Sequence, residues 1–275
     1  MHFADGFRDD SRLDIGGKNG GAMKIPIRLP ALPLRKAPGR AFASLLQLAR
    51  SGLYRPCCRI CGHDLVQARE KIICLDCRER IVPTADHACR VCGKFVPDGV
   101  DACGSCLLQA PPFDRHLSCA AYEGTLREAI ILYKYGEIEP LKHLLAQLCL
   151  ETVRTKLPGR FDAVVPVLAD RGRRHGFQPV RAMGAVLAHG MGTGFWPRTL
   201  RKTRRTCPQV GLTQAQRRAN LDGAFALAAG KKIVGKSILL IDDVTTTGTT
   251  LRQCAAALKK GGARVTALSL AQSRL

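Results

Sequence analysis

Residues 237–250 read Ser237-Ile-Leu-Leu-Ile-Asp242-Asp243-Val-Thr-Thr-Thr-Gly248-Thr-Thr250. An apolar run that ends in polar residues predicts a parallel strand buried on both faces, followed by a loop and a helix N-terminus. Ligands of open α/β sheets bind outside such strand ends. Between Thr246 and Thr250, backbone N–H groups, hydroxyls and the helix dipole can wrap a phosphate, and Gly248 permits close approach of the backbone. The stretch therefore predicts an α/β fold with a phosphate site.

Two acidic residues, Asp242 and Asp243, come just before this loop. Their carboxylates would repel a phosphate, so we expect them to accept hydrogen bonds from hydroxyl groups or from water on a bound metal. The alternative is a capped helix start, in which the acids and threonines only satisfy the N–H groups of the first turn.

The chain on either side of this stretch alternates apolar strands with helical patterns after Pro111-Pro112. Such alternation predicts an α/β unit with a mainly parallel sheet. We expect strands at residues 116–122, 163–167, 196–200, 237–244 and 264–270. We expect helices at residues 125–135, 141–153, 179–189, 213–220 and 249–260.

Eight of the 13 cysteines form four CxxC pairs within residues 58–106. Two residues between cysteines let a tight turn aim both thiolates at one ion, and a following glycine closes such a knuckle. Four thiolates make a closed tetrahedral site, which is structural rather than catalytic. The predicted zinc ligands are Cys58, Cys61, Cys74 and Cys77 in one site and Cys89, Cys92, Cys103 and Cys106 in the other.

The cysteine spacing leaves three alternatives open. Some pairs can be redox-active or simply reduced, and the second double pair, with its short loop, can lack a metal. Cys57 can replace Cys58 with one extra residue of spacing. Spacing also does not tell whether the ligands group sequentially or in a cross-brace.

The composition is strongly basic, with 43 Lys+Arg against 22 Asp+Glu and a formal charge of +21. The field of such a chain favours polyanions such as nucleotides, pyrophosphate or nucleic acid. No run of about 18 apolar residues and no secretory signal pattern occurs, so we expect no membrane span and a cytoplasmic protein. Residues 1–38 have little apolar periodicity and are expected to be loose. Residues 40–53 are expected to form a short helix. Translation can also start at Met23.

Residues 237–250 resemble the signature of the type I phosphoribosyltransferases, in which four apolar residues precede two acids and a Thr-Gly-x-Thr phosphate loop. Further stretches narrow the resemblance to the ComF family and cover the chain from about residue 55 to its end. In order, they are the CxxC pairs, Leu132-Tyr-Lys134-Tyr-Gly136, Val164-Val-Pro166-Val167, Gly176-Phe177-Gln178 and Pro208-Gln209-Val-Gly-Leu212. The chain departs from the family pattern after Val167, where it is about two residues shorter and lacks a His-Pro-x-Arg stretch.

The resemblance implies a type I phosphoribosyltransferase-like, mainly parallel sheet flanked by helices, with an N-terminal zinc-ribbon module. It implies a disordered tail and short helix at residues 1–54, a double zinc ribbon at 55–112 and a phosphoribosyltransferase-like domain at 113–275. It also implies that Asp242 and Asp243 hold the ribose hydroxyls as the catalytic pair. The substrate-binding residues implied are Val244, Thr245, Thr246, Thr247, Gly248, Thr249 and Thr250 in the phosphate loop, Leu168, Ala169, Asp170 and Arg171 in a pyrophosphate loop, and Lys134, Arg204 and Arg205.

Some of these assignments have alternatives. The tyrosines beside Lys134 can simply pack its helix onto the sheet. The segment that contains Arg204 and Arg205 resembles a loop that closes over a site. The arginines between residues 171 and 218, where no acid occurs, suit pyrophosphate but equally suit a solvated or nucleic-acid-facing surface.

The function that the resemblance implies is binding of phosphoribosyl pyrophosphate with Mg²⁺ and transfer of the phosphoribosyl group to a nucleobase, with structural zinc. It further implies a link to DNA uptake, with single-stranded DNA or DNA-uptake proteins as partners. The alternative is a non-catalytic protein that binds phosphoribosyl pyrophosphate or single-stranded DNA. The sequence specifies neither the acceptor nor the oligomeric state.

Overall fold

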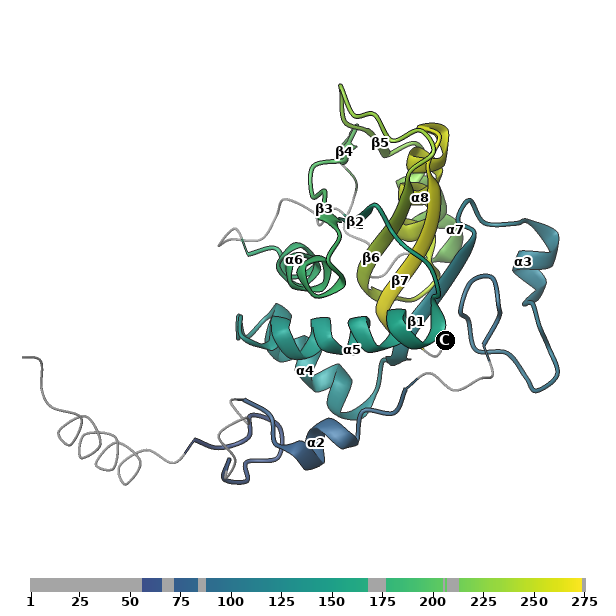
Figure 1. Ribbon diagram of the computed structural model, residues 1–275. Coiled ribbons are helices and arrows are strands. Elements are labelled where there is room, and N and C mark those ends of the chain that lie inside the picture. Colours follow the sequence, from purple (N-terminus) through teal and green to yellow (C-terminus); the bar gives the residue numbers. More distant parts are fainter. Residues whose placement is uncertain are drawn as a thin grey trace, which may run out of the picture. The chain divides into compact units, whose positions relative to one another are not determined.

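The structure is a computed structural model that describes residues 56–65, 72–83, 88–167, 177–204, 206 and 213–273. The tail and short helix expected at residues 1–54 lie outside the described residues. The strands are β1 (Arg115–Ala121), β2 (Ala163–Pro166), β3 (Gly194–Phe195), β4 (Leu200–Lys202), β5 (Phe225–Leu227), β6 (Ser237–Thr245) and β7 (Arg264–Gln272). The helices are α2 (Leu75–Glu79), α3 (Gly104–Leu108), α4 (Gly124–Lys134), α5 (Leu141–Lys156), α6 (Pro179–Met191), α7 (Gln214–Leu221) and α8 (Thr249–Lys260), labelled in Figure 1.

Five strands form one sheet in the order β1-β7-β6-β2-β3 (Figure 1). Each neighbouring pair is parallel, so the predicted mainly parallel sheet is confirmed. The central strand β6 pairs with β7 on one side and β2 on the other, for example Leu239 with Thr266 and with Val164. Strands β4 and β5 form a separate antiparallel pair.

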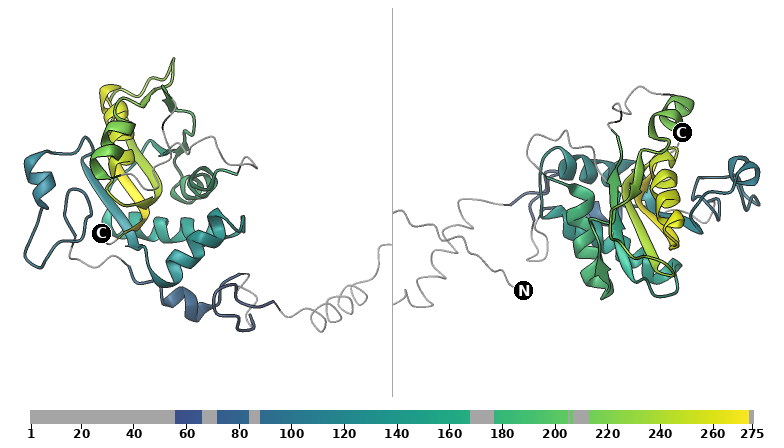
Figure 2. Two further views of the ribbon diagram at one scale, coloured as in Figure 1. Left: turned by 180° about the vertical axis from the view of Figure 1, so that it is seen from behind. Right: turned by 90° about the horizontal axis from the view of Figure 1, so that it is seen from above.

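The apolar run of β6 is buried on both faces because successive side chains enter two different cores. Leu239 and Ile241 belong to one core, which contains the apolar faces of α4, α5 and α6. Ile238 and Leu240 belong to the other, which contains the apolar face of α8. Figure 2 shows these helices on opposite sides of the sheet. A run without polar alternation is what a strand covered by helices on both faces requires.

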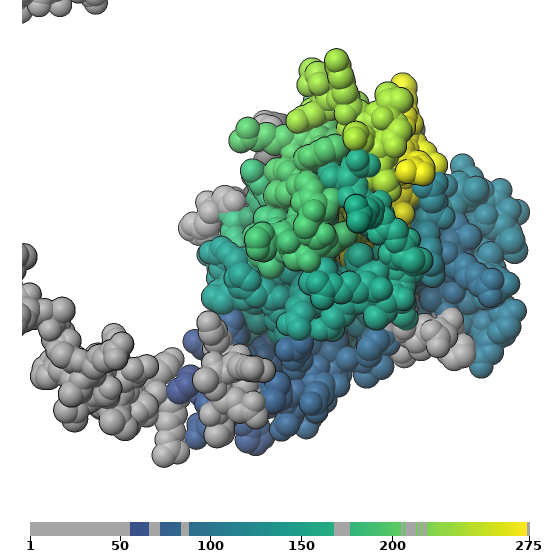
Figure 3. All heavy atoms as spheres, viewed as in Figure 1, coloured from purple at the N-terminus to yellow at the C-terminus, as the bar shows by residue number. Residues whose placement is uncertain are grey.

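The two cysteine-rich segments join opposite cores. We call residues 56–65 and 72–83 the first ribbon and residues 88–109 the second ribbon. Ile73, Cys77 and Ile81 of the first ribbon pack in the core with α4, α5 and α6. Cys89 and Cys106 of the second ribbon pack in the core with α8. The ribbons form separate parts of the molecular surface in Figure 3, in dark and lighter blue.

Most predicted elements are confirmed to within a few residues, but the strand predicted at residues 196–200 is wrong. The chain turns there, between β3 and β4, and the Thr199 hydroxyl donates to the Trp196 carbonyl at 3.0 Å. Pro197 has no N–H to give to a strand ladder, which is why the turn falls at this point. The short strand β5 was not predicted. In the described part of the chain, no helix is long and apolar enough to cross a membrane.

The division between a ribbon module at 55–112 and a domain at 113–275 stays a prediction.

Candidate functional site

The loop after β6 leads directly into α8. Gly248 is the residue before the helix, with φ of 72°, in the left-handed region that favours glycine. A Cβ added there would meet only the Thr245 Cγ2 methyl at 3.7 Å, so the conformation rather than lack of space requires glycine. The hydroxyls of Thr247 and Thr249 lie 2.8 Å apart across the turn. The loop thus presents hydroxyls beside the positive end of the helix dipole, as phosphate binding needs.

The acid pair lies at the carboxyl end of β6, just before this loop. Asp242 accepts a hydrogen bond from the Asp243 N–H at 2.8 Å, and Asp243 accepts one from the Val244 N–H at 2.7 Å. Burial and then the neighbouring Asp243 carboxylate raise the pKa of Asp242 to about 7. A ligand whose hydroxyl groups donate hydrogen bonds to these carboxylates would stabilise their ionised form. The acid pair is therefore suited to bind a ligand with hydroxyl groups.

Lys134, at the end of α4, reaches the acid pair rather than the threonine loop. Its Nζ lies 2.6 Å from Asp243 Oδ2, with both side chains less than one-fifth exposed. Its charge also lowers the pKa of Asp242, against the larger effect of burial. Of the two adjacent tyrosines, Tyr133 is buried and donates to the Pro179 carbonyl at 2.8 Å, whereas Tyr135 is exposed. Packing by Tyr133 therefore fixes the helix that carries Lys134.

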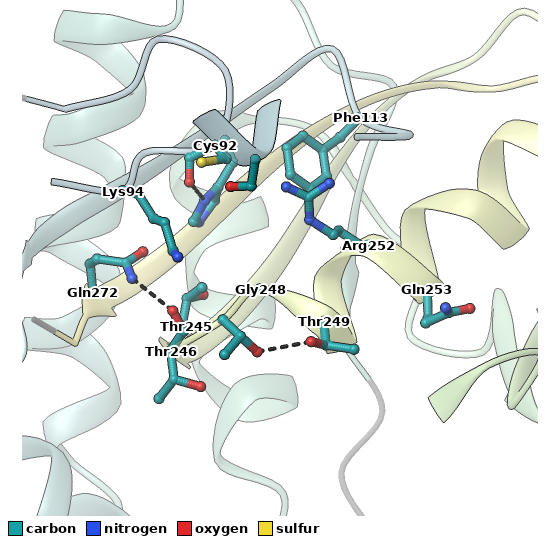
Figure 4. Close-up of a pocket in the computed structure, with 13 residues that line it drawn as sticks. Cys92, Lys94, Phe113, Thr245, Thr246, Gly248, Thr249, Arg252, Gln253 and Gln272 are labelled. Carbon is teal, nitrogen blue, oxygen red and sulfur yellow. Dashed lines mark hydrogen bonds between the residues drawn. The ribbon is translucent and has the colours of Figure 1, made fainter. Parts of the chain in front are cut away.

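A cavity of about 70 Å³ lies between the threonine loop and the second ribbon (Figure 4). Sequence reasoning did not anticipate the wall opposite the loop, which the second ribbon, β1, β7 and α8 supply. The lining residues outside the loop are Cys92, Lys94, Ser105, Phe113, His116, Arg252, Gln253 and Gln272. Lys94 follows the predicted knuckle glycine, but nothing in the cysteine spacing tells which surface a ribbon faces.

Two polar atoms in this lining have no hydrogen-bond partner among the described residues. They are Thr245 Oγ1 and Gln272 Oε1, on side chains that are 5% and 1% exposed. The Gln272 amide nitrogen donates to the carbonyls of Thr246 and Ser273, and this fixes the orientation of its oxygen. Buried polar atoms without partners are rare and call for an explanation.

His116 joins the second ribbon to the sheet. It is 1% exposed, its Nδ1 donates to the Cys92 carbonyl at 2.7 Å, and its Nε2 accepts from the Ser269 hydroxyl at 3.0 Å. Burial lowers the pKa of His116 to about 4, so the ring is neutral at physiological pH. His116 belongs to none of the sequence motifs, so this contact with the Cys92 carbonyl could not be predicted.

The eight predicted zinc ligands form two tetrads, Cys58, Cys61, Cys74 and Cys77, and Cys89, Cys92, Cys103 and Cys106. Within each tetrad all sulfur atoms lie within 4.8 Å of one another. Cys58 Sγ lies 3.4 Å from the N–H donors of Ile60 and Cys74, and Cys89 Sγ lies 3.3 Å from the N–H donor of Cys103. N–H groups aimed at sulfur suit thiolates, and four sulfurs suit zinc, so each tetrad can hold a zinc ion.

The geometry also decides two of the alternatives that spacing left open, the grouping of the ligands and the choice between Cys57 and Cys58. Both tetrads group their cysteines sequentially, so there is no cross-brace. Cys57 is exposed and outside the first tetrad, whereas Cys58 is inside it and buried. The second set of four comes together as closely as the first.

Several predicted site residues are not part of this arrangement. Leu168, Ala169, Asp170, Arg171 and Arg205 lie outside the described residues, as does much of the arginine-rich stretch. Arg204 is exposed, and its guanidinium donates to the carbonyls of Ala219 and Asp222 at 3.3 and 2.9 Å. The structure therefore joins Lys134 to the acid pair but gives Arg204 contacts on α7.

Comparison with known proteins identifies the relatives of this chain. It is 31% identical over 212 residues to the DNA utilization protein YhgH of Salmonella typhi, with 70% of this chain and 92% of the relative aligned. It is 29% identical over 202 residues to the Competence protein F of Haemophilus influenzae, with 69% and 85% aligned. The chain belongs to the ComF family. No family model matches this ComF-family chain.

The predicted fold class of the ComF-family protein is confirmed as a mainly parallel sheet flanked by helices, with cysteine modules that can bind zinc. The adenine phosphoribosyltransferase of Kineococcus radiotolerans is 32% identical over 117 residues, 40% of this chain and 62% of that one. Among solved structures, adenine phosphoribosyltransferases of Trypanosoma brucei and Saccharomyces cerevisiae overlap with TM-scores of 0.38 and 0.34, at 9% and 14% identity. The overlaps cover 60% and 52% of this chain and 84% and 72% of those chains.

Proposed function

We propose that this protein binds phosphoribosyl pyrophosphate together with Mg²⁺ and transfers the phosphoribosyl group to a nucleobase. The observation that carries the proposal is the convergence of an acid pair, a lysine and a threonine loop at the carboxyl end of the central strand β6. Carboxylates suit sugar hydroxyls, and a helix N-terminus with hydroxyls suits a phosphate. A ribose 5-phosphate unit presents both groups on one molecule.

In this proposal, Asp242 and Asp243 accept hydrogen bonds from the ribose 2- and 3-hydroxyls. Lys134 favours their ionised form, because its charge lowers the pKa of Asp242. The loop from Val244 to Thr250 would hold the 5-phosphate with its N–H groups and hydroxyls. Together these contacts would fix the sugar, so that its anomeric carbon faces the attacking base.

We assign the pyrophosphate end of the ligand to the loop after β2 and to the arginines that follow β4. Leu168, Ala169, Asp170, Arg171 and Arg205 stay predictions. Arg204 would have to exchange its bonds to the carbonyls of Ala219 and Asp222 for phosphate oxygens. Carbonyl and phosphate oxygens both accept hydrogen bonds from a guanidinium, and the bond to phosphate is stronger because the phosphate is negatively charged.

The transfer itself needs positioning and charge stabilisation. A nitrogen lone pair of the base forms the new bond to the anomeric carbon while the bond from that carbon to the pyrophosphate oxygen breaks. Pyrophosphate leaves with the electron pair, and the base nitrogen loses its proton to water. The carboxylate oxygens of the acid pair would accept hydrogen bonds from water bound to Mg²⁺. When bound, this ion would neutralise part of the charge of the leaving pyrophosphate.

The alternative function is binding without turnover, of phosphoribosyl pyrophosphate or of single-stranded DNA. Two observations favour it: the relatives are called a DNA utilization protein and a Competence protein F, and the chain carries a formal charge of +21. A basic surface would hold phosphate backbones during DNA uptake. The cysteine tetrads suit a reducing compartment, so we place either function in the cytoplasm.

Calorimetric titration of zinc-loaded protein with phosphoribosyl pyrophosphate and Mg²⁺ tests the proposal, with an Asp242→Asn/Asp243→Asn variant beside the wild type. We expect the wild type to bind and the variant to bind at least about 100-fold more weakly, because two charge-assisted contacts are lost. Pyrophosphate release on addition of individual nucleobases would identify the enzyme and its acceptor. Binding without release with any base or nucleic acid would favour the alternative, and no binding by folded wild type would refute the site.

A further inference from the structure

The cavity between the threonine loop and the second ribbon has a one-sided charge. Among the residues that the structure describes, its lining contains Lys94 and Arg252 and no acidic residue. The first N–H groups of α8 and the helix dipole add positive potential on the loop side. Such a lining favours an anion and disfavours a cation.

Lys94 is the cation that faces the loop. Its side chain is partly buried and points toward Gln272 and the Thr245–Thr246 end of the loop (Figure 4). Among the described residues, no carboxylate pairs with it. Arg252, by contrast, is turned to the ribbon, with its guanidinium over the Phe113 ring and 3.7 Å from Cys106 Sγ.

The buried atoms without partners supply the second half of an anion site. The Thr245 hydroxyl can donate to a phosphate oxygen, and the Gln272 amide oxygen can accept from an ammonium group or from a ligand hydroxyl. A cavity of about 70 Å³ exceeds the roughly 30 Å³ share of one water molecule. That room suits a phosphate group.

The position of Lys94 depends on the fold of the second ribbon. The Cys89 N–H donates to the Lys94 carbonyl at 2.7 Å, and the Gly93 N–H donates to the Cys89 carbonyl at 2.8 Å. Gly93 has φ of 66°, and a Cβ there would lie only 3.0 Å from the His116 carbonyl oxygen. The knuckle that carries Lys94 therefore begins at Cys89 of the second tetrad, and its Gly93 packs closely against β1.

We propose that the second ribbon is part of the phosphate site: Lys94 donates to the phosphate held by the threonine loop, and metal in the second tetrad keeps Lys94 in place. This inference rests on the proposed function, because it assumes that the loop binds a phosphate. It makes phosphate affinity depend on zinc in one ribbon and not in the other, whose residues do not line the cavity.

Calorimetry with ribose 5-phosphate at fixed low ionic strength tests the role of Lys94. We expect Lys94→Ala to weaken binding about tenfold or more, the loss of one charged hydrogen bond, and Lys94→Arg to recover part of the affinity. Lys231→Ala removes an exposed charge outside the cavity and is the matched control, expected to change the affinity less than about twofold. Equal affinity of Lys94→Ala and wild type would overturn the inference and leave the proposed function standing, whereas a wild type that binds no ribose 5-phosphate would overturn both.

The zinc dependence is tested with one cysteine from each tetrad. We expect Cys103→Ser to weaken ribose 5-phosphate binding as much as Lys94→Ala does, and the double variant to lose no more than either change alone. Cys61→Ser, in the first tetrad, measures the general cost of disturbing a ribbon and should have a clearly smaller effect. An equal loss in the two cysteine variants, or an additive loss in the double variant, would contradict the coupling.

Discussion

The two ribbons have the same local geometry. In each, four cysteines group within 4.8 Å, and a short helix, α2 or α3, begins directly after the third cysteine. In each, the first sulfur faces backbone N–H groups: Cys58 faces those of Ile60 and Cys74, and Cys89 faces those of Cys92 and Cys103. A reader of the sequence would treat them as duplicates.

Their surroundings differ. The first ribbon packs apolar residues into the core with α4, α5 and α6, and its Arg78 lies 3.6 Å from Glu151 at the surface. The second ribbon is joined to the sheet by buried His116 and forms a wall of the cavity beside the threonine loop. The same cysteine motif therefore occurs in two different surroundings. The role of each ribbon depends on the surface that it covers.

The largest test of the comparison is the loss of one metal ligand from each tetrad. We expect Cys58→Ser and Cys89→Ser each to lower the free energy of unfolding by on the order of 3–5 kcal/mol, because a ribbon has little apolar core without its metal. Zinc analysis by atomic absorption should fall from two ions per chain to one in both variants. Urea unfolding gives the free energies.

Cys57→Ser is the matched control, since Cys57 is exposed, adjacent to Cys58 and outside the tetrad. It should retain two zinc ions and wild-type stability to within about 0.5 kcal/mol. Retention of two ions in Cys89→Ser would show that the second tetrad does not hold a metal in the way its geometry indicates.

The attachment of the second ribbon to the sheet is tested at His116. We expect His116→Ala to lower the free energy of unfolding by about 2–3 kcal/mol, because the Cys92 carbonyl and the Ser269 hydroxyl lose a buried partner. His116→Asn, which retains a donor, should recover part of that loss. Urea unfolding of the three proteins checks the result, and an Ala variant as stable as wild type would mean that the ribbon is held by its apolar contacts alone.

The next effect is at the acid pair, where Lys134 contacts Asp243. The folded pKa of Asp242 is about 7, above its ordinary value of 3.8, so the folded state binds the proton more tightly than the unfolded state. Stability from this group is therefore present at low pH and lost as pH rises through about 7. The loss begins above about pH 4, and about 1.4 kcal/mol of it falls between pH 6 and pH 8.

Asp242→Asn should remove this loss, so that the variant gains stability relative to wild type as pH rises from 6 to 8. Thermal unfolding at several pH values measures the difference. Lys134→Met should move the loss to higher pH, because Lys134 lowers the pKa of Asp242, while Lys94→Met should leave the profile unchanged. A difference between Asp242→Asn and wild type that does not vary with pH would contradict the raised pKa.

The sheet could be predicted because its signals are local. The apolar run at 238–241 specifies a strand buried on both faces, and Gly248 with its threonines specifies the following helix start. The four CxxC pairs were also predictable because each pair lies within one tight turn, whereas the grouping of the pairs into two tetrads came only from the structure. Short strands such as β3 and β5 have too few residues to show a period, and they form only because a neighbouring strand pairs with them.

The second wall of the site could not be predicted, because it depends on tertiary packing. Lys94 and Gln272 are about 180 residues apart in sequence, and neither belongs to a recognisable motif. Lys134 was a predicted ligand-binding residue, and its partner in the structure is Asp243. Residue type predicted the chemistry, and only the fold determined which charges meet.

The smallest effect concerns the surface contact of the first ribbon. Arg78 and Glu151 are 3.6 Å apart, with side chains 36% and 53% exposed, so water and salt screen the pair. A double-mutant cycle with Arg78→Ala and Glu151→Ala should give a coupling of at most about 0.5 kcal/mol, decreasing with added salt. A coupling above about 1 kcal/mol would mean that the first ribbon, like the second, is attached by a specific polar contact. A small coupling beside a large His116 effect would show that the first ribbon is held by apolar packing, as Ile73 and Ile81 indicate, and that only the second is fixed in orientation by directed hydrogen bonds.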